Sequence, residues 1–171
     1  MTDPPNLHDP AWDVERPEDP FRSRVMRAGH RAGARELGAS LYELDPGGAV
    51  SPYHHHHGNE ELLIVLAGRP AVRTPAGTRR VDPGAVVAFP RGEAGAHRVT
   101  NPGPEPARVL IVSTMNLPEV AEYPDTGTVL TVTGPAARRA FPAAAASPWA
   151  ERVVEAMRAG DAHAAASPTE T

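Results

Sequence analysis

Residues 51–68 read SPYHHHHGNEELLIVLAG, and this stretch decides both the fold and the site that the sequence predicts. Its second half, ELLIVLAG, has the length and apolar character of a buried strand. Its first half holds four consecutive histidines, followed after Gly58 and Asn59 by two carboxylates. Because these polar groups stand directly before a core strand, a metal site is the first hypothesis to consider.

Strand geometry limits how many of these histidines can share one site. Side chains on a strand alternate between its faces, so His54 and His56 point one way while His55 and His57 point the other. Glu61 opens the next strand, and in a hairpin its carboxylate can lie beside a histidine pair. Two neutral imidazoles and one carboxylate form a recognised ligand set for a divalent metal with open positions.

The composition narrows the class of protein. The chain has 171 residues, 40% of them hydrophobic, and a formal net charge of -4, so we expect neither nucleic acid nor an anionic membrane as a partner. No apolar run approaches the roughly 18 residues that span a bilayer, and the acidic, Pro-rich start is unlike a secretory signal. We therefore expect a cytoplasmic location. Since the chain has no cysteine, nitrogen and oxygen atoms must supply any metal ligands.

Prolines and glycines divide the central sequence into short apolar runs, a pattern typical of an all-β sandwich or barrel. We expect about eight antiparallel strands in residues 40–115, joined by turns of roughly 2–5 residues. A further strand is possible at Thr128–Thr133. The expected strand runs are LYEL, AVSPYHHHH, ELLIVLAG, RPAVRT, TRRV, AVVAF, HRVTN and ARVLIVSTM.

The segments that flank this barrel differ from it in composition. Residues 1–36 are Pro-rich and predict an extended arm that partly wraps a barrel over residues 37–135. Residues 136–171 form a C-terminal extension, in which a Ser-Pro pair predicts the start of a helix near residues 148–159.

That helix is expected to present one apolar face. Trp149, Val153 and Met157 recur at four-residue steps, and Gly160 can end the helix. We expect the helix to pack on the barrel or on a partner subunit, and the Ala-, Ser- and Thr-rich tail after it to be disordered.

The histidine stretch resembles the first motif of the cupin superfamily, G(X)5HXH(X)3–4E(X)6G, which residues 48–68 match without a gap. The second motif of that family is G(X)5PXG(X)2H(X)3N, and residues 84–101 read GAVVAFPRGEAGAHRVTN. This segment matches except that four residues instead of two precede His97, which lengthens a loop. The resemblance covers residues 40–115 and implies a small single-domain cupin, a double-stranded β-helix or jelly-roll barrel.

The resemblance also implies residue roles. His54, His56, Glu61 and His97 would hold one divalent metal ion inside the barrel, and Asn101 would be a turn residue. Three nitrogens and one carboxylate can bind Fe, Mn, Ni, Co, Cu or Zn, and affinity order alone does not choose among these metals.

Two alternatives to this ligand set remain open at the level of sequence. Glu60 competes with Glu61, although its alternate parity turns it outward. The register could also slip so that His55 and His57 face the metal, although the spacing from Gly48 favours the other pair.

The residues expected around the metal are apolar. With Glu61 inward, Leu63 and Val65 point inward as well, and three further residues are weaker candidates for the pocket lining: Tyr42, Phe89 and Met115. An apolar pocket beside an ion with about two open positions suits a small organic substrate coordinated at the metal. No catalytic side chain is assigned.

Three functions fit this site. A dioxygenase acting on an enol or phenol is preferred, because it asks least of the protein beyond the metal. A metal-dependent isomerase acting on a sugar-like substrate is the alternative, and a dedicated acid–base group beside the metal would favour it. A cupin that binds a small molecule without chemistry is the third.

We also expect a homodimer, because the arm and the helix exceed what barrel closure needs.

Overall fold

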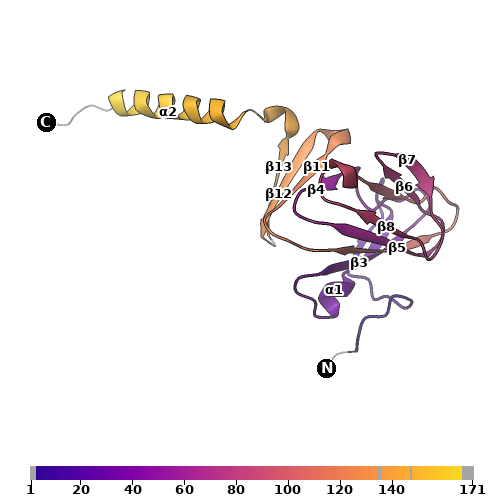
Figure 1. Cartoon of the computed structure of the whole chain (residues 1–171). Helices are drawn as coiled ribbons and strands as arrows, with labels where there is room; N and C mark the ends of the chain where they lie inside the picture. Colours follow the sequence, from indigo (N-terminus) through magenta and orange to yellow (C-terminus); the bar gives the residue numbers. More distant parts are fainter. Residues whose placement is uncertain (1–2, 135, 147, 167–171) are drawn as a thin grey trace.

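The computed structural model describes residues 3–134, 136–146 and 148–166 and shows a mostly β molecule with a C-terminal helix (Figure 1). Its strands are β1 (Val14–Arg16), β2 (Ser23–Met26), β3 (Gly38–Leu44), β4 (His55–His56), β5 (Glu61–Ala67), β6 (Ala71–Thr74), β7 (Gly77–Arg80), β8 (Val86–Phe89), β9 (Arg98–Thr100), β10 (Ala107–Ser113), β11 (Glu119–Tyr123), β12 (Thr128–Gly134) and β13 (Ala137–Pro142). The helices are α1 (Ala28–Arg31) and α2 (Trp149–Ala166), with short 3-10 turns η1 (Glu93–Gly95), η2 (Pro124–Thr126) and η3 (Ala143–Ala145).

These strands form three antiparallel sheets, and the main hydrophobic core is built by residues of the six-stranded and three-stranded sheets and the loops beside them. The sheet orders are β1-β2-β3-β10-β5-β8, β13-β12-β11-β4 and β7-β6-β9. Alternate residues of β5 and β10, such as Leu63, Val65 and Val109, are almost fully buried, as expected for strands that present one face to the core. The predicted all-β jelly roll with a C-terminal helix is confirmed.

The N-terminal arm contributes strands that the sequence does not predict. All four residues of β2 pair with β3, and β1 pairs with β2, so the arm supplies two strands at one edge of the six-stranded sheet. Met26 and Leu41 are buried here in a second small core, against which Trp12 packs. Because a bare edge of β3 would expose unpaired backbone groups, this pairing protects the sheet.

The C-terminal part also differs from expectation. The strand expected at Thr128–Thr133 is β12, but its neighbours β11 and β13 were not predicted. Helix α2 continues past Gly160, because one glycine costs only about 1 kcal/mol and alanines follow it. It projects away from the barrel instead of packing on it (Figure 1). The last part of the predicted disordered tail, residues 167–171, lies outside the described residues.

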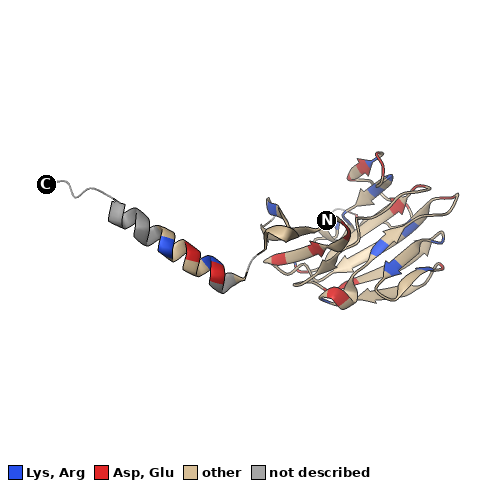
Figure 2. Cartoon of the chain, turned by 90° about the horizontal axis from the view of Figure 1, so that it is seen from above, with Lys and Arg blue, Asp and Glu red and all other residues tan. Residues whose placement is uncertain are grey.

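Acidic and basic residues are interspersed over the strands of the barrel (Figure 2). No helix among the described residues is long and apolar enough to cross a membrane.

Candidate metal centre

The histidine run forms less strand than expected, yet its side chains alternate as the sequence predicts. Residues 50–53 are bends, and regular structure starts with His54, which forms an isolated bridge with His97. The two residues exchange backbone hydrogen bonds, with N–O distances of 3.1 and 2.8 Å. His56 lies in β4 opposite Ala121 of β11.

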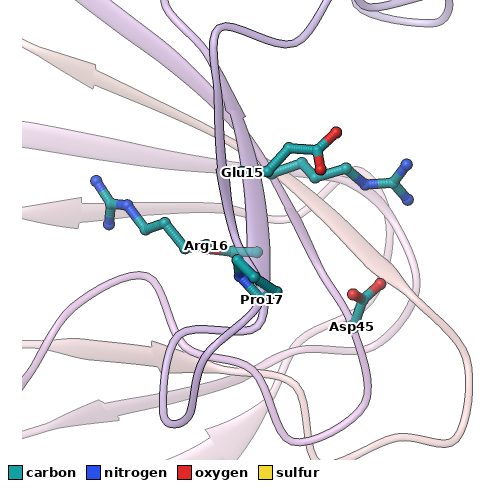
Figure 3. A pocket seen from close by; sticks show the side chains of 6 residues that line it. Glu15, Arg16, Pro17 and Asp45 are labelled. Carbon is teal, nitrogen blue, oxygen red and sulfur yellow. The ribbon is translucent and has the colours of Figure 1, made fainter.

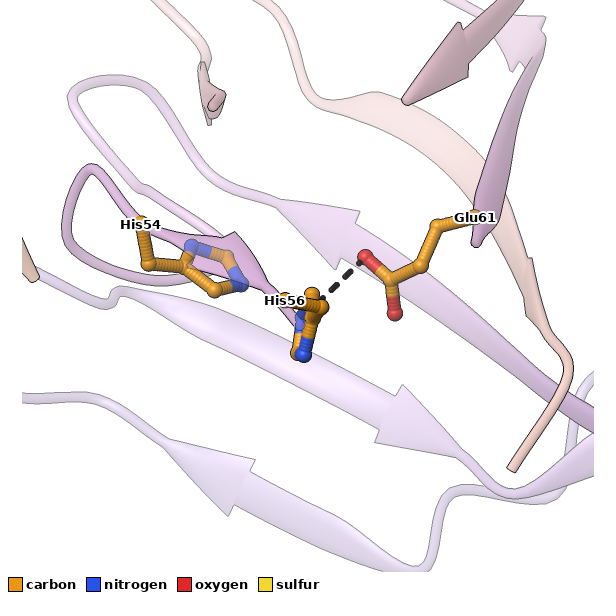
Figure 4. Close-up of side chains that lie close together, drawn as sticks. All are labelled: His54, His56 and Glu61. Carbon is orange, nitrogen blue, oxygen red and sulfur yellow. Dashed lines mark ion pairs between the residues drawn. The ribbon is translucent and has the colours of Figure 1, made fainter. Parts of the chain in front are cut away.

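Glu61 faces these histidines from the first position of β5 (Figure 4). Its Oε2 lies 3.6 Å from Nε2 of His56 and 3.3 Å from Nε2 of His97. One ligand atom from each of His54, His56 and Glu61 lies within 4.8 Å of the others. The structure therefore brings together all four side chains that the cupin resemblance implies as ligands.

The alternative ligands that the sequence leaves open lie elsewhere. His55 and His57 belong to a separate cluster with Glu122. Glu60 is exposed. The register with His54 and His56 facing Glu61 is the one that the structure adopts.

Main-chain carbonyls orient two of the imidazoles. Nδ1 of His54 donates to the Pro52 carbonyl and Nδ1 of His97 donates to the Gly95 carbonyl, both at 2.9 Å. A carbonyl oxygen can only accept, so each Nδ1 carries the proton and each Nε2 keeps a free lone pair. Such acceptors behind a ligating imidazole are what a metal site requires.

The lengthened loop of the second motif supplies one of these carbonyls. Its residues 93–95 form η1, and Gly95 at its end approaches Pro90 so closely that a Cβ on Gly95 would lie 1.7 Å from the Pro90 carbonyl oxygen. The ring of Phe89 stacks on His97 with 3.7 Å between centroids. The insertion therefore builds a support for His97 and does not displace it.

Strand β11 adds two residues that were not predicted. Glu119 is buried, accepts hydrogen bonds from the side chain of Asn59 and the backbone N–H of His57, and lies 3.5 Å from Nδ1 of His56. The ring of Tyr123 stacks on His54 with 5.3 Å between centroids. The alternation of Glu119, Ala121 and Tyr123 before the turn PDTG is the signal that could have identified this strand.

Burial and mutual contact set the charges at the site. Burial, reinforced by the neighbouring His97 and His56, lowers the pKa of His54 to about 4. Burial alone would raise the pKa of Glu61, but the polar contact with His97 and the nearby His56 and His54 outweigh it and hold that pKa below its usual value. At neutral pH His54 is therefore neutral and Glu61 is ionised, which are the states that bind a metal.

The donor set fits a divalent ion. Nε2 of His97 is buried and has no hydrogen-bond partner among the described residues, although it faces Glu61. Burying such an atom without a partner costs about 1–3 kcal/mol, which a ligand would offset. The side chain of His97 is only 2% exposed whereas that of His56 is 20% exposed, so the site is more open to solvent on the His56 side.

The predicted pocket residues divide into two groups. Leu63, Val65 and Phe89 lie in the buried core, and Tyr42 packs against it, where burial raises the pKa of its phenol. Met115 is 57% exposed, so its assignment to the pocket is wrong. Strand β10 ends at Ser113, and the chain then turns through Met115 with a φ of 53°, out of the strand alternation that would have carried its side chain inward.

A separate pocket of about 240 Å³ lies between the N-terminal arm and the barrel (Figure 3). It shares no residue with the histidine cluster, and its Arg24 already pairs with Glu43. The lining residues are Glu15, Arg16, Pro17, Ser23, Arg24 and Asp45.

A comparison with protein families finds a match over the central part of the chain. Residues 40–113 match the family model described as a cupin domain. No curated protein matches the chain.

Three solved structures illustrate the similarity. A protein from Acidithiobacillus ferrooxidans, provisionally named a sugar phosphate isomerase, has a TM-score of 0.71 and 25% identity over 80% of this chain and 86% of its own. A sugar phosphate isomerase from a cupin superfamily, from Silicibacter pomeroyi, has a TM-score of 0.69 and 26% identity over 75% of this chain and 82% of its own. The polyketide cyclase RemF from Streptomyces resistomycificus, with a TM-score of 0.54 and 23% identity over 68% of this chain and 81% of its own, shares the fold.

Proposed function

Because residues 40–113 form a cupin domain, we propose that the protein is a metal-dependent isomerase that acts on a sugar phosphate. The observation that carries the proposal is the convergence of His54, His56, Glu61 and His97, in which buried ring nitrogens of His56 and His97 have no hydrogen-bond partner among the described residues. The similarity to sugar phosphate isomerases extends over most of the chain and favours this alternative over the dioxygenase expected from the sequence.

The four side chains would hold one divalent ion through three imidazole nitrogens and a carboxylate oxygen. When bound, such an ion supplies Lewis-acid polarisation of a carbonyl or hydroxyl oxygen of the substrate. The carbonyls of Pro52 and Gly95 keep the rings of His54 and His97 in the tautomer that this role needs.

An isomerisation also needs groups that move protons, and Tyr123 is the candidate for the general acid, the group that donates a proton to a substrate oxygen. Its ring lies parallel to that of His54, at an angle of 13°. Burial raises the pKa of Tyr123, the carboxylates of Glu61 and Glu119 raise it further, and Arg138 acts in the opposite direction. The phenol is therefore protonated at neutral pH and can donate a proton to a substrate oxygen. A dedicated acid–base group beside the metal is what distinguishes an isomerase from the other two functions.

Arg138 can recognise the phosphate. Glu119 pairs with Val132 and Val132 pairs with Arg138, so the three side chains lie on one face in a row across β11, β12 and β13. Arg138 is exposed and takes part in none of the ion pairs formed between the described residues. Its charge is thus available at the edge of the site, where a phosphate needs a guanidinium.

The test is an isomerisation assay under nitrogen. The protein is stripped of metal, reloaded in parallel with Fe(II), Mn(II), Ni(II) and Zn(II), and incubated with pentose and hexose phosphates in deuterium oxide, with NMR detection of the isomers. We expect turnover without oxygen. Turnover that requires oxygen, or activity that survives complete metal removal, contradicts the proposal.

Two matched pairs of variants test the roles. Tyr123→Phe is expected to lower kcat by about 100-fold or more, whereas Tyr53→Phe, the same change at a tyrosine outside the cluster, leaves kcat within about twofold.

Arg138→Gln is expected to raise KM for the phosphorylated substrate. Arg139→Gln, whose side chain lies on the opposite face of the strand, is expected to leave KM unchanged. Equal effects of the two tyrosine variants would contradict the role of Tyr123 in proton transfer. Equal effects of the two arginine variants would contradict the role of Arg138 in phosphate recognition.

A further inference from the structure

We propose that His55, His57 and Glu122 form a second divalent-metal site on the opposite face of the β4–β11 strand pair. The histidine run has four members, and the site described above uses only those of one parity. The other two histidines meet a carboxylate of β11, so the run supplies ligands to both faces of the same strand pair.

The geometry brings three ligand atoms together. One nitrogen from each of His55 and His57 and one oxygen of Glu122 lie within 4.8 Å of one another. Nε2 of His57 lies 2.8 Å from Oε1 of Glu122, and the two imidazole centroids are 5.1 Å apart. The backbone fixes this arrangement, because His55 pairs directly with Glu122 and the N–H of His57 donates to the Val120 carbonyl at 2.9 Å.

His55 provides an independent reason for a ligand. It is only 2% exposed, and neither of its ring nitrogens has a hydrogen-bond partner among the described residues. Each buried nitrogen left in this state costs about 1–3 kcal/mol. A metal ion between His55, His57 and Glu122 satisfies one of them.

The donor set defines the class of ion. Two imidazoles and one carboxylate suit Zn(II), Ni(II), Co(II) or Cu(II), whereas Mg and Ca prefer all-oxygen sites. The side chains of His57 and Glu122 are 47% and 42% exposed, so an ion enters from solvent and keeps water in its remaining positions. Its role is structural: it joins β4 to β11, the strands that carry His56 and Tyr123 of the inner site.

The test is the stoichiometry of Zn(II) bound by the full chain, measured by equilibrium dialysis and elemental analysis. We expect two ions in the wild type, one in the His57→Gln/Glu122→Gln variant and one in the His54→Gln/His97→Gln variant. The control His30→Gln/Glu60→Gln changes an exposed histidine and an exposed carboxylate elsewhere and should retain two ions.

Three results would overturn the second site. The wild type could bind a single ion that is lost only in His54→Gln/His97→Gln, or the second ion could persist in His57→Gln/Glu122→Gln. The second ion could also bind only under conditions in which analytical ultracentrifugation shows that the chain dimerises. Retention of the inner ion shows that the outer-site variant is folded. If the inner site bound nothing, the outer-site variant would still lose one ion, so this proposal and the proposed function fail separately.

Discussion

His54 and His97 are buried imidazoles that each bind a main-chain carbonyl through Nδ1 and leave Nε2 facing the site. A structural histidine in a core would use both nitrogens, because an unpaired buried nitrogen is unfavourable. The free Nε2 of His97 beside Glu61 therefore indicates a site built for a ligand.

The depressed pKa of His54 predicts how the stability of the metal-free protein depends on pH. The pKa is about 4 in the folded protein, against the ordinary histidine pKa of 6.5, so the unfolded chain takes up a proton first as the pH falls. Above about pH 6.5 this residue leaves the free energy of unfolding unchanged. That free energy declines as the pH falls from about 6.5 to about 4, and below about pH 4 the contribution of His54 becomes constant. Between pH 7 and 5 we expect a loss of about 2 kcal/mol in the free energy of unfolding.

Urea unfolding of the metal-free protein at pH 7, 6 and 5 measures this slope. The His54→Gln variant removes the titrating group and should show a shallower dependence on pH than the wild type. Identical slopes in the two proteins would mean that His54 is not the buried neutral imidazole described above.

The residues of the site differ in how far the sequence could predict them. Alternation and motif spacing place His54, His56 and Glu61 correctly, because both are local properties of two adjacent strands. Glu119 and Tyr123 could not be placed in this way, since they reach the site through pairing of β11 with β4, about sixty residues away in sequence. Met115 was misplaced because a left-handed residue interrupts the strand alternation.

At the scale of elements, η1 links the second motif to the site. Its Gly95 carries the carbonyl that accepts the Nδ1 proton of His97, and it has no room for a Cβ. Gly95→Ala should therefore displace the turn and weaken metal binding at least tenfold, an effect typical of the loss of a group that orients a ligand. Competition with a chromophoric chelator measures the affinity.

The control for this variant is Gly134→Ala. A Cβ at Gly134 meets its nearest atom at an ordinary distance of 3.9 Å, so this change should leave metal affinity unaltered. An unchanged affinity in Gly95→Ala would show that the position of His97 does not depend on η1.

The strands that sequence analysis missed share a physical cause. β1 and β2 have three and four residues, which is too short for a clear period of two. They form strands because the edge of β3 offers backbone groups to pair with, which is a tertiary effect. The longer runs β3, β5 and β10 carry enough buried alternate residues to be recognised from the sequence.

At the scale of the whole molecule, α2 projects from the barrel with Val154 45% and Met157 65% exposed (Figure 1). The homodimer expected from the sequence stays a prediction, and these side chains are where a second copy could bury apolar surface. Light scattering should give twice the chain mass at micromolar concentration. A chain that ends at Ala146 should show a smaller dimer fraction with an unchanged circular dichroism spectrum of the barrel.

A monomer mass for the full chain would contradict the predicted homodimer. An equal dimer fraction in the shortened chain would instead assign the interface to the barrel or the arm.

The central claim is that His54, His56, Glu61 and His97 hold one divalent ion. Anomalous diffraction from crystals of the Zn(II)-loaded protein, with data collected on both sides of the zinc edge, tests it most directly. The account predicts a zinc peak about 2.0–2.2 Å from one nitrogen of each of the three histidines and from a carboxylate oxygen of Glu61. The absence of a peak there, in crystals that show zinc only at other residues, would contradict it.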